Sequence, residues 1–186
     1  LLAARGYSRF ESKDETGLGD ITVGGRYRLW DLDTRAGGLF GSVQGGLGLP
    51  TGAVSDPGDI TSIDRGSGVF EFRTSHVLNY TPKLWDDRLT FSHSINYSHR
   101  LPGSRLKRVP TDASDVLPDE SSEEKVSMQL GDKLWTVLGG RVKLAPWASL
   151  GGTYEWYWYG KDVYSGSRSD RDYSILSKGT ASFTET

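Results

Sequence analysis

A period-two alternation of apolar and polar residues recurs along this chain and constrains its fold more than any other feature. In the stretch GDITVGGRYRLWD, Ile21 and Val23 fall on one face of an extended strand, whereas Arg26 and Arg28 fall on the other. Successive side chains of a β-strand point to opposite faces, while an amphipathic helix needs a repeat near 3.6 residues. No long stripe with the helical repeat is found in the sequence, so the chain is predicted to be all-β.

The alternation predicts about eight strands. They cover residues 1–12, 19–31, 37–49, 69–80, 88–101, 125–139, 141–160 and 172–184. The first of these segments alternates least clearly. In the seventh, Pro146 cannot donate a hydrogen bond to a neighbouring strand, which indicates a bulge or a local break.

The connections between these segments alternate strictly between short and long. The short ones read LDTRAGG, TPKLWDD and LGGR, and the long ones cover residues 50–68, 102–125 and 160–171. An up-and-down barrel places its tight turns at one rim and its long loops at the other, as outer-membrane barrels do. A soluble sandwich has no reason to sort its loops in this way. The sequence therefore favours an antiparallel up-and-down transmembrane β-barrel, with residues 1–186 as a single domain.

Composition agrees with a membrane barrel and argues against several other classes. Hydrophobic residues reach only 35% of the chain, which is low for a soluble domain of 186 residues. The net charge of −2 argues against a strongly basic nucleic-acid surface, and the absence of Cys excludes disulfides and thiolate metal sites. No run of about 18 apolar residues predicts a transmembrane helix, and the strands have roughly the 9 to 11 residues that a tilted barrel strand needs.

Two short motifs resemble those of a known family. GLGDITVGGRYRLWD at residues 17–31 joins a GLGD opening to an alternating strand, and GGLGLPTG at residues 45–52 ends a glycine-rich strand. Together they are similar to outer-membrane β-barrels associated with phenol meta-pathway degradation operons. The resemblance implies an outer-membrane barrel that helps hydrophobic or aromatic compounds across the bacterial outer membrane.

Members of that family usually have longer chains and more strands. This chain begins in a weakly marked strand and ends in SFTET, without the terminal aromatic residue typical of bacterial barrels. We therefore expect either a barrel of about eight strands or a fragment of a larger barrel. The distinction matters because the number of strands sets the width of the lumen.

The stretch TYEWYWYGK concentrates large aromatic side chains in one strand. Tyr154, Trp156 and Trp158 share the apolar face of this strand, at the end that enters a long loop. Aromatic rings with one polar edge favour the headgroup level of a membrane, so these three residues are predicted to form an aromatic girdle. The alternative is a stacking platform, in which Tyr157 and Tyr159 on the other face meet a ligand at the barrel mouth.

Charged residues on the polar faces of the strands are the candidate lumen-lining residues. They are Arg26, Arg28, Glu71, Arg73, Arg100, Lys143 and Glu155. In a wide barrel they would form a charged, net positive constriction that selects solutes. In a narrow barrel they would pair across strands and fill the interior, which is the favoured interpretation for eight strands.

The apolar halves of the best-alternating strands are predicted to face lipid. These residues are Ile21, Val23, Tyr27, Phe70, Phe72, Leu89, Phe91 and Ile95. The histidines His76, His93 and His99 fall on the same face, and His93 lies about 20 Å from His99 along one strand, too far to share a metal ion. No nucleophile elbow, phosphate loop or metal quartet is found, so no enzyme activity, cofactor or metal site is predicted.

Residues 102–125 form the longest predicted loop. Its basic start, with Arg105, Lys107 and Arg108, would suit lipopolysaccharide phosphates, and its acidic end would suit divalent cations. The acidic residues are Asp112, Asp115, Asp119, Glu120, Glu123 and Glu124. A solvated, mobile loop is the favoured interpretation.

The leading functional hypothesis is an outer-membrane channel for passive uptake of small solutes, with hydrophobic or aromatic compounds among the candidates. The alternative is a structural barrel with a filled lumen, which acts as a scaffold or sheath for a partner protein. An outer-membrane enzyme is the least favoured hypothesis. The expected partners are outer-membrane lipid, with lipopolysaccharide as a candidate, and small solutes, whereas nucleic acid is not expected.

Overall fold

Six long strands and one short strand form an antiparallel sheet. The computed structural model describes residues 2–8, 16–84, 88–180 and 183–185. The order of the strands across the sheet is β1-β2-β3-β4-β7-β8-β10. Their bounds are β1 Ile21–Asp33, β2 Gly37–Leu49, β3 Glu71–Pro82, β4 Leu89–Arg100, β7 Lys133–Ala145, β8 Ala148–Tyr159 and β10 Phe183–Glu185. The all-β, antiparallel prediction is therefore confirmed.

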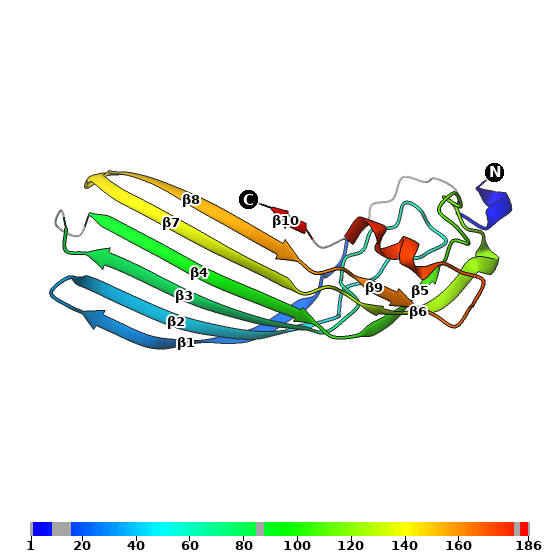
Figure 1. Ribbon diagram of the computed structural model, residues 1–186, viewed down its shortest axis with the longest axis horizontal. Helices are drawn as coiled ribbons and strands as arrows, with labels where there is room; N and C mark the ends of the chain where they lie inside the picture. Colours follow the sequence, from blue (N-terminus) through cyan, green and yellow to red (C-terminus); the bar gives the residue numbers. More distant parts are fainter. Residues whose placement is uncertain (1, 9–15, 85–87, 181–182, 186) are drawn as a thin grey trace.

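The two ends of the sheet differ in their connections. Residues 34–36 and 146–147 connect β1 to β2 and β7 to β8, and these two turns lie at the same end of the sheet as the end of β3 and the start of β4 (Figure 1). Residues 50–70, 101–132 and 160–180 belong to the long connections, which meet at the other end. The predicted separation of short turns from long loops is thus found for the connections from β1 to β2 and from β3 to β4, whereas the third tight turn lies at residues 146–147 and not at LGGR. We call the end with the two tight turns the turn end.

The turn between β1 and β2 depends on two residues. The hydroxyl oxygen of Thr34 accepts hydrogen bonds from the backbone N–H groups of Ala36 and Gly37 at 3.2 and 3.1 Å. This is the local side-chain capping that favours Thr and Ser in turns. Gly37 has φ +152°, and a Cβ at this position would overlap the carbonyl of Thr81 in β3. Glycine therefore lets β2 begin immediately after the turn.

The long connections fold into a compact unit that we call the cap, comprising residues 2–8, 50–70, 101–132 and 160–180. It contains a three-stranded sheet of β5 (Gly103–Arg108), β6 (Glu123–Gln129) and β9 (Val163–Ser165), with 3₁₀ turns η1 (Ala3–Arg5), η2 (Glu120–Ser122) and η3 (Tyr173–Thr180). The buried hydrophobic residues of the described chain all belong to the cap. They are Tyr7, Val69, Val109, Val126 and Met128. The apolar core thus sits beside the long sheet and not within it.

A β-bulge changes the side of the sheet that the end of β1 presents. Arg28 is opposite Ser42, but Trp30 is opposite Gly41, so Leu29 is an extra residue in β1. An inserted residue reverses the alternation that follows it. Trp30 therefore lies on the side opposite to Arg28, where its ring is 5.9 Å from that of His76. Simple alternation predicts that Trp30 lies on the same side of the sheet as Arg28, and this prediction is wrong because of the bulge.

Two predicted strands are wrong because each of them combines parts of two strands. Residues 125–139 contain the end of β6 and the start of β7, which belong to different sheets. Residues 141–160 form two strands joined by a tight turn at residues 146–147. The predicted turn LGGR lies inside β7. Alternation stays in phase across this hairpin because the register shifts at Leu144, so that Lys143 is opposite Ser149, and the pattern alone therefore did not reveal the reversal.

The two terminal strands are also wrong over most of their length. Ala3–Arg5 forms the turn η1, and part of the predicted strand 1–12 lies outside the described residues. Tyr173–Thr180 forms η3 where a strand was expected. Asp172 stabilises the start of η3, since its carboxylate accepts a hydrogen bond from the Ser174 N–H at 3.0 Å. Local capping of this kind competes with extended structure.

The described strands do not close into a barrel. β1 lies at one edge of the seven-stranded sheet and β10 at the other, and β10 pairs with only residues 157–159 of β8. No helix among the described residues is long and apolar enough to cross a membrane.

Candidate functional site

The register of the long sheet sorts its side chains onto two faces. Residues opposite each other in paired strands point to the same side of a sheet. One row across five strands consists of Arg26, Gln44, Ser75, Asn96 and Trp135. The next row points to the other side and consists of Tyr27, Val43, His76, Ile95 and Thr136. We call the first side the polar face and the second the apolar face.

The apolar face presents large hydrophobic side chains to the surroundings. Seven of the eight residues predicted to face lipid are exposed, namely Ile21, Val23, Tyr27, Phe70, Phe72, Phe91 and Ile95, and Leu89 is partly exposed. These side chains therefore do not pack into a closed core of this chain. Soluble monomers rarely expose a continuous apolar surface of this kind, and such surfaces mark protein or membrane contacts.

The seven charged residues predicted to line a lumen all map to the polar face. Glu71 and Arg100 are opposite each other at the cap end, while Lys143 lies at the turn end opposite Ser149. The other four, Arg26, Arg28, Arg73 and Glu155, lie between these ends. The charges are therefore distributed along the face and do not form a single cluster.

Ion pairs neutralise part of the charge on the polar face. The guanidinium of Arg73 donates to both carboxylate oxygens of Glu71 at 2.8 and 2.9 Å. The hydroxyl of Ser98 donates to the same carboxylate. Arg28 donates to Asp31 at 2.9 Å, and both of these side chains are largely exposed. Exposed pairs contribute little to stability, so their main effect is on the local electrostatic field.

A hollow of about 480 Å³ lies on the polar face over β1, β2 and β3 and reaches Asn96 of β4 and Trp135 of β7. Its floor includes Gly24 and Gly46, which are opposite each other in the register. Arg26, Gln44 and Trp135 are among the side chains that line it. The hollow exists because two glycines leave no side chains where neighbouring rows carry long ones.

Sequence reasoning missed the uncharged residues of this hollow. Gln44, Ser75 and Asn96 occupy the row of Arg26, and the Ser75 hydroxyl donates to the Asn96 amide oxygen at 2.7 Å. Trp135 extends the row on β7. The alternation of Gln44, Ser75 and Asn96 with apolar neighbours could have identified them, but the candidate lumen-lining residues were selected by charge alone.

The predicted aromatic girdle lies on the apolar face of β8. Tyr154, Trp156 and Trp158 are opposite Leu138, Thr136 and Leu134 of β7. Trp158 is near the cap end, whereas Tyr154 lies four residues further along the strand, which corresponds to about 14 Å. The girdle assignment stays a prediction.

Two tyrosines occupy the opposite side of the same strand. The rings of Tyr157 and Tyr159 stack with centroids 6.1 Å apart. The Tyr157 hydroxyl donates to the carboxylate of Glu155, and the ammonium group of Lys133 lies 5.6 Å from the Tyr159 ring centroid. The stacked pair therefore belongs to the polar face, and its role as a stacking platform for a ligand stays a prediction.

The histidines are distributed along the apolar face. His99 Nδ1 is 2.8 Å from one carboxylate oxygen of Asp132, and the Tyr97 hydroxyl donates to the other at 2.6 Å. His93 Nε2 is 2.9 Å from the Thr136 hydroxyl. Among the residues that the structure describes, no group of three or more His, Asp or Glu side chains is arranged to hold a metal ion.

The cap contains buried and paired charges. The Arg108 side chain is 4% exposed, donates to the Glu123 carboxylate at 3.0 Å and lies over the Tyr7 ring at 4.1 Å. Arg105 donates to Asp64 at 2.7 Å. Burial alone would raise the pKa of Asp64, but hydrogen bonds from Arg105 and Ser55 lower it to about 2.

The predicted solvated loop is therefore wrong for much of residues 102–125. Within this segment, residues 103–108 form β5, residues 120–122 form η2 and residues 123–125 begin β6, and β5 pairs with β6 in the cap. Two of the three basic residues proposed for lipopolysaccharide, Arg105 and Arg108, already have carboxylate partners. The third, Lys107, has its ammonium group 5.2 Å from the Tyr164 ring centroid. Binding of lipopolysaccharide stays a prediction.

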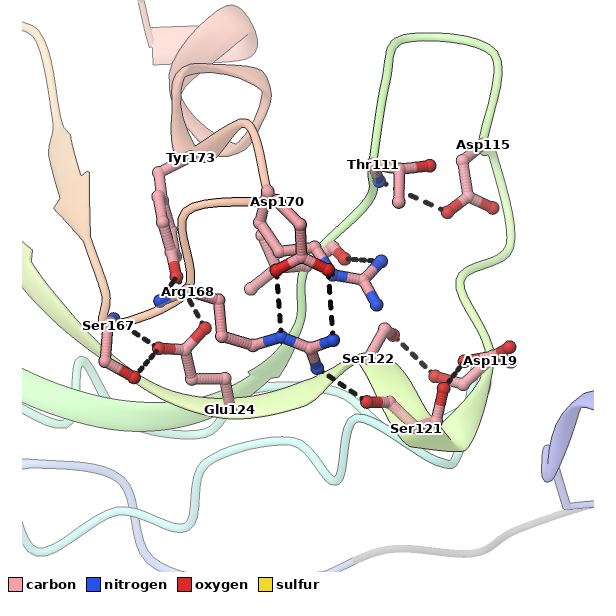
Figure 2. Close-up of polar contacts among 12 residues, drawn as sticks. Thr111, Asp115, Asp119, Ser121, Ser122, Glu124, Ser167, Arg168, Asp170 and Tyr173 are labelled. Atoms are coloured by element: carbon pink, nitrogen blue, oxygen red, sulfur yellow. Dashed lines mark hydrogen bonds and ion pairs between the residues drawn. The ribbon is translucent and has the colours of Figure 1, made fainter.

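Figure 2 shows how the acidic end of this segment is held. The Glu124 carboxylate accepts hydrogen bonds from the Ser167 hydroxyl at 2.9 Å and from the Tyr173 hydroxyl at 2.5 Å. The hydrogen bond from Tyr173, followed by that from the Ser167 backbone, lowers the pKa of Glu124. Arg168 donates to the Ser121 carbonyl at 2.7 Å. These contacts join β6 and η2 to residues 167–173, and the carboxylate of Glu124 is hydrogen-bonded within the cap.

Comparison with known proteins supports the resemblance found in the sequence. A search of curated proteins finds no match to the chain. A family described as "Putative MetA-pathway of phenol degradation" matches residues 2–181, which include the long strands β1 to β8 and the cap. The match thus extends well beyond the two motifs near the N-terminal end. The chain belongs to this phenol-degradation family.

Proposed function

We propose that the chain forms part of an outer-membrane β-barrel whose polar face lines a water-filled lumen for passive passage of small solutes. The observation that carries the proposal is the contrast between the two faces of one sheet. The apolar face exposes Tyr27, Phe72 and Ile95, while the polar face carries charges and an open hollow. A barrel wall between lipid and water requires this contrast on every strand.

The length of the strands supports a membrane-spanning role. The six long strands contain 12 or 13 residues each. Strands of this length extend about 40 Å and, when tilted by about 45°, cover the roughly 30 Å hydrocarbon layer of a bilayer.

The unpaired outer edges of β1 and β8 support the proposal that the sheet is part of a closed barrel in the membrane. Backbone groups at the outer edges of β1 and most of β8 lack strand partners within the described chain. Each unpaired group would cost several kcal/mol in lipid, so only a closed arrangement is stable there. In the proposed barrel the two edges join each other or pair with further strands.

A test of the channel uses ion selectivity in planar lipid bilayers. Arg26, Arg28, Arg73 and Arg100 give the polar face a positive field that Glu71 and Glu155 oppose only in part. We expect Arg73→Glu to shift the selectivity of the open channel toward cations. Lys125→Glu carries the same charge change on the exposed side of β6 and should have a smaller effect. Absence of conductance in the wild-type protein would contradict the channel.

A filled scaffold is the second candidate, favoured by ion pairs within single strands that already neutralise part of the polar face, Glu71 with Arg73 in β3 and Arg28 with Asp31 in β1. In a narrow barrel the side chains of the polar face would fill the lumen and block solutes. Membrane insertion without conductance would support this scaffold. Under either proposal the chain has no enzymatic role, and its main partner is outer-membrane lipid.

A further inference from the structure

A second hollow, of about 570 Å³, lies on the apolar face over β3, β4, β7 and β8. Its floor includes Gly140 of β7 and Gly152 of β8, which are opposite each other in the register. Two neighbouring strands therefore carry no side chain at this point of the face. Large apolar and aromatic side chains surround the gap, namely Leu78, Tyr80, Phe91, Leu138 and Tyr154. We call this space the apolar hollow.

The backbone does not require glycine at the floor of the apolar hollow. A Cβ at Gly140 or at Gly152 would have nothing within 4 Å, and neither residue has a positive φ. Their neighbours on the polar face differ, because a Cβ at Gly139 would overlap the Ser92 hydroxyl and one at Gly151 would lie 2.9 Å from the Gly140 carbonyl oxygen. Glycine weakens a strand, and inside a strand it often marks a place where a ligand approaches the backbone closely.

The polar atoms of two rings that line the apolar hollow are engaged within the protein. The Tyr80 hydroxyl donates to the Ala36 carbonyl at 3.2 Å. The Thr136 hydroxyl donates to the Ser94 carbonyl at 2.9 Å, so it accepts from His93 Nε2, which is also 2.9 Å away. Of the described residues that line the hollow, none is Lys, Arg, Asp or Glu. The lining therefore suits an aliphatic occupant and offers no charged partner to an ionic one.

We propose that the apolar hollow binds one acyl chain of a membrane phospholipid, which lies over Gly140 and Gly152 against Phe91, Leu138 and Tyr154. The inference rests on the proposed function, because only a membrane barrel presents this face to acyl chains. If the hollow were empty, its lining would lack dispersion contacts on one side, and a flexible hydrocarbon chain can fill such a space. The hollow thus adds one specific lipid site to a face that elsewhere contacts lipid without a defined position.

Native mass spectrometry tests the proposal on protein inserted into vesicles and then extracted into a mild detergent. The vesicles contain equal amounts of phosphatidylethanolamine and phosphatidylglycerol with identical acyl chains. We expect one phospholipid to be retained by each protein molecule. Because the lining carries no charge, the two headgroups should be retained in the proportion in which they are supplied.

Two independent variants test the position of the bound chain. Gly140→Leu on β7 and Gly152→Leu on β8 each place a side chain in the apolar hollow, and each should remove the retained phospholipid. Gly25→Leu is the matched control on the apolar face of β1, outside the hollow, where a Cβ also has nothing within 4 Å. It should retain phospholipid as the wild type does. Circular dichroism verifies that each variant is folded.

Three results would overturn this lipid site. They are the absence of a retained phospholipid in the wild type, its retention by both Gly140→Leu and Gly152→Leu, and an equal loss in Gly25→Leu. A mass of two protein chains without lipid would also overturn the site, because it would identify a second copy of the chain as the occupant.

Failure of this inference is distinguishable from failure of the proposed function. Protection of the long strands from added protease reports separately whether the wild-type protein is inserted into the vesicles. Insertion without a retained phospholipid removes the lipid site and leaves the membrane barrel. Failure to insert removes both.

Discussion

Gly41 and Gly45 lie on the same face of β2, yet a side chain would meet different surroundings at each. A Cβ at Gly41 would overlap the indole ring of Trp30, while a Cβ at Gly45 would have nothing within 4 Å. Trp30 lies there because the bulge at Leu29 turned it to the apolar face. The packing of the Trp30 ring therefore requires glycine at position 41, although nothing in the sequence distinguishes Gly41 from the other glycines of β2.

We expect Gly41→Ala to lower the free energy of unfolding by about 1–3 kcal/mol, the usual cost of overpacking. Gly45→Ala is the matched control and should change it by less than about 0.5 kcal/mol. Urea titration of the protein in detergent or lipid measures both. In a Trp30→Val background the cost of Gly41→Ala should largely disappear. An equal cost for Gly41→Ala in both backgrounds would show that Trp30 is not its cause.

At the scale of elements, the cap is held by contacts between segments that are distant in sequence. Arg105 of β5 donates to Asp64 at 2.7 Å and to the Ser55 hydroxyl at 3.0 Å. Asp64 also accepts a hydrogen bond from the Ser55 N–H at 2.6 Å. These contacts join β5 to the connection between β2 and β3. The alternation that identified the long strands cannot predict such contacts, because it depends only on residues that are adjacent in the sequence.

The Asp64–Arg105 pair predicts a pH dependence. Since the pKa of Asp64 is about 2 in the folded protein against 3.8 ordinarily, its contribution is present above about pH 4 and is lost as the pH falls toward 2. Because Asp64 is partly exposed, we expect a contribution of only about 1 kcal/mol at neutral pH. Asp64→Asn should therefore destabilise the protein at pH 6 but not at pH 2, as measured by thermal unfolding.

The control for this experiment is Glu120→Gln, which removes an exposed carboxylate from the same cap. It should leave the difference between pH 6 and pH 2 unchanged relative to the wild type. A loss of stability in Asp64→Asn that is the same at both pH values would be incompatible with an ionised Asp64 as its source.

At the scale of the whole molecule, the contrast between the two faces of the sheet predicts that the polar face meets water and the apolar face meets lipid. Ile95 is 46% exposed on the apolar face of β4, and Ser92 is exposed on the polar face of the same strand. If both faces met water, a charge would be tolerated equally well at either position. If the apolar face meets lipid, the two positions differ strongly.

We expect Ile95→Arg to cost about 2–4 kcal/mol of unfolding free energy in lipid vesicles, as for a cation near the middle of a barrel wall. Ser92→Arg should cost less than about 0.5 kcal/mol, because its side chain enters water. Urea unfolding of the protein inserted in vesicles gives both values. Equal costs at the two positions would refute the membrane orientation of the sheet.

The sequence by itself determined the face of nearly every residue in β2, β3, β4 and β8, because alternation is a local property of extended backbone. It also predicted the short connections from β1 to β2 and from β3 to β4, and thereby the antiparallel order of these four strands, but it placed the third turn at residues 138–141 instead of 146–147. The polar residues of the hollow could have been predicted by the same rule, since Gln44, Ser75 and Asn96 alternate with apolar neighbours.

Only the tertiary structure decided which segments pair. It placed residues 123–129 and 133–145 in different sheets, turned Trp30 to the apolar face through the bulge at Leu29, and made a 3₁₀ turn of residues 173–180. It also brought Val109, Val126 and Met128 together as the core of the cap. The physical reason is that register and burial depend on partners far along the chain, whereas a periodic pattern of residues indicates only the local conformation of its own segment.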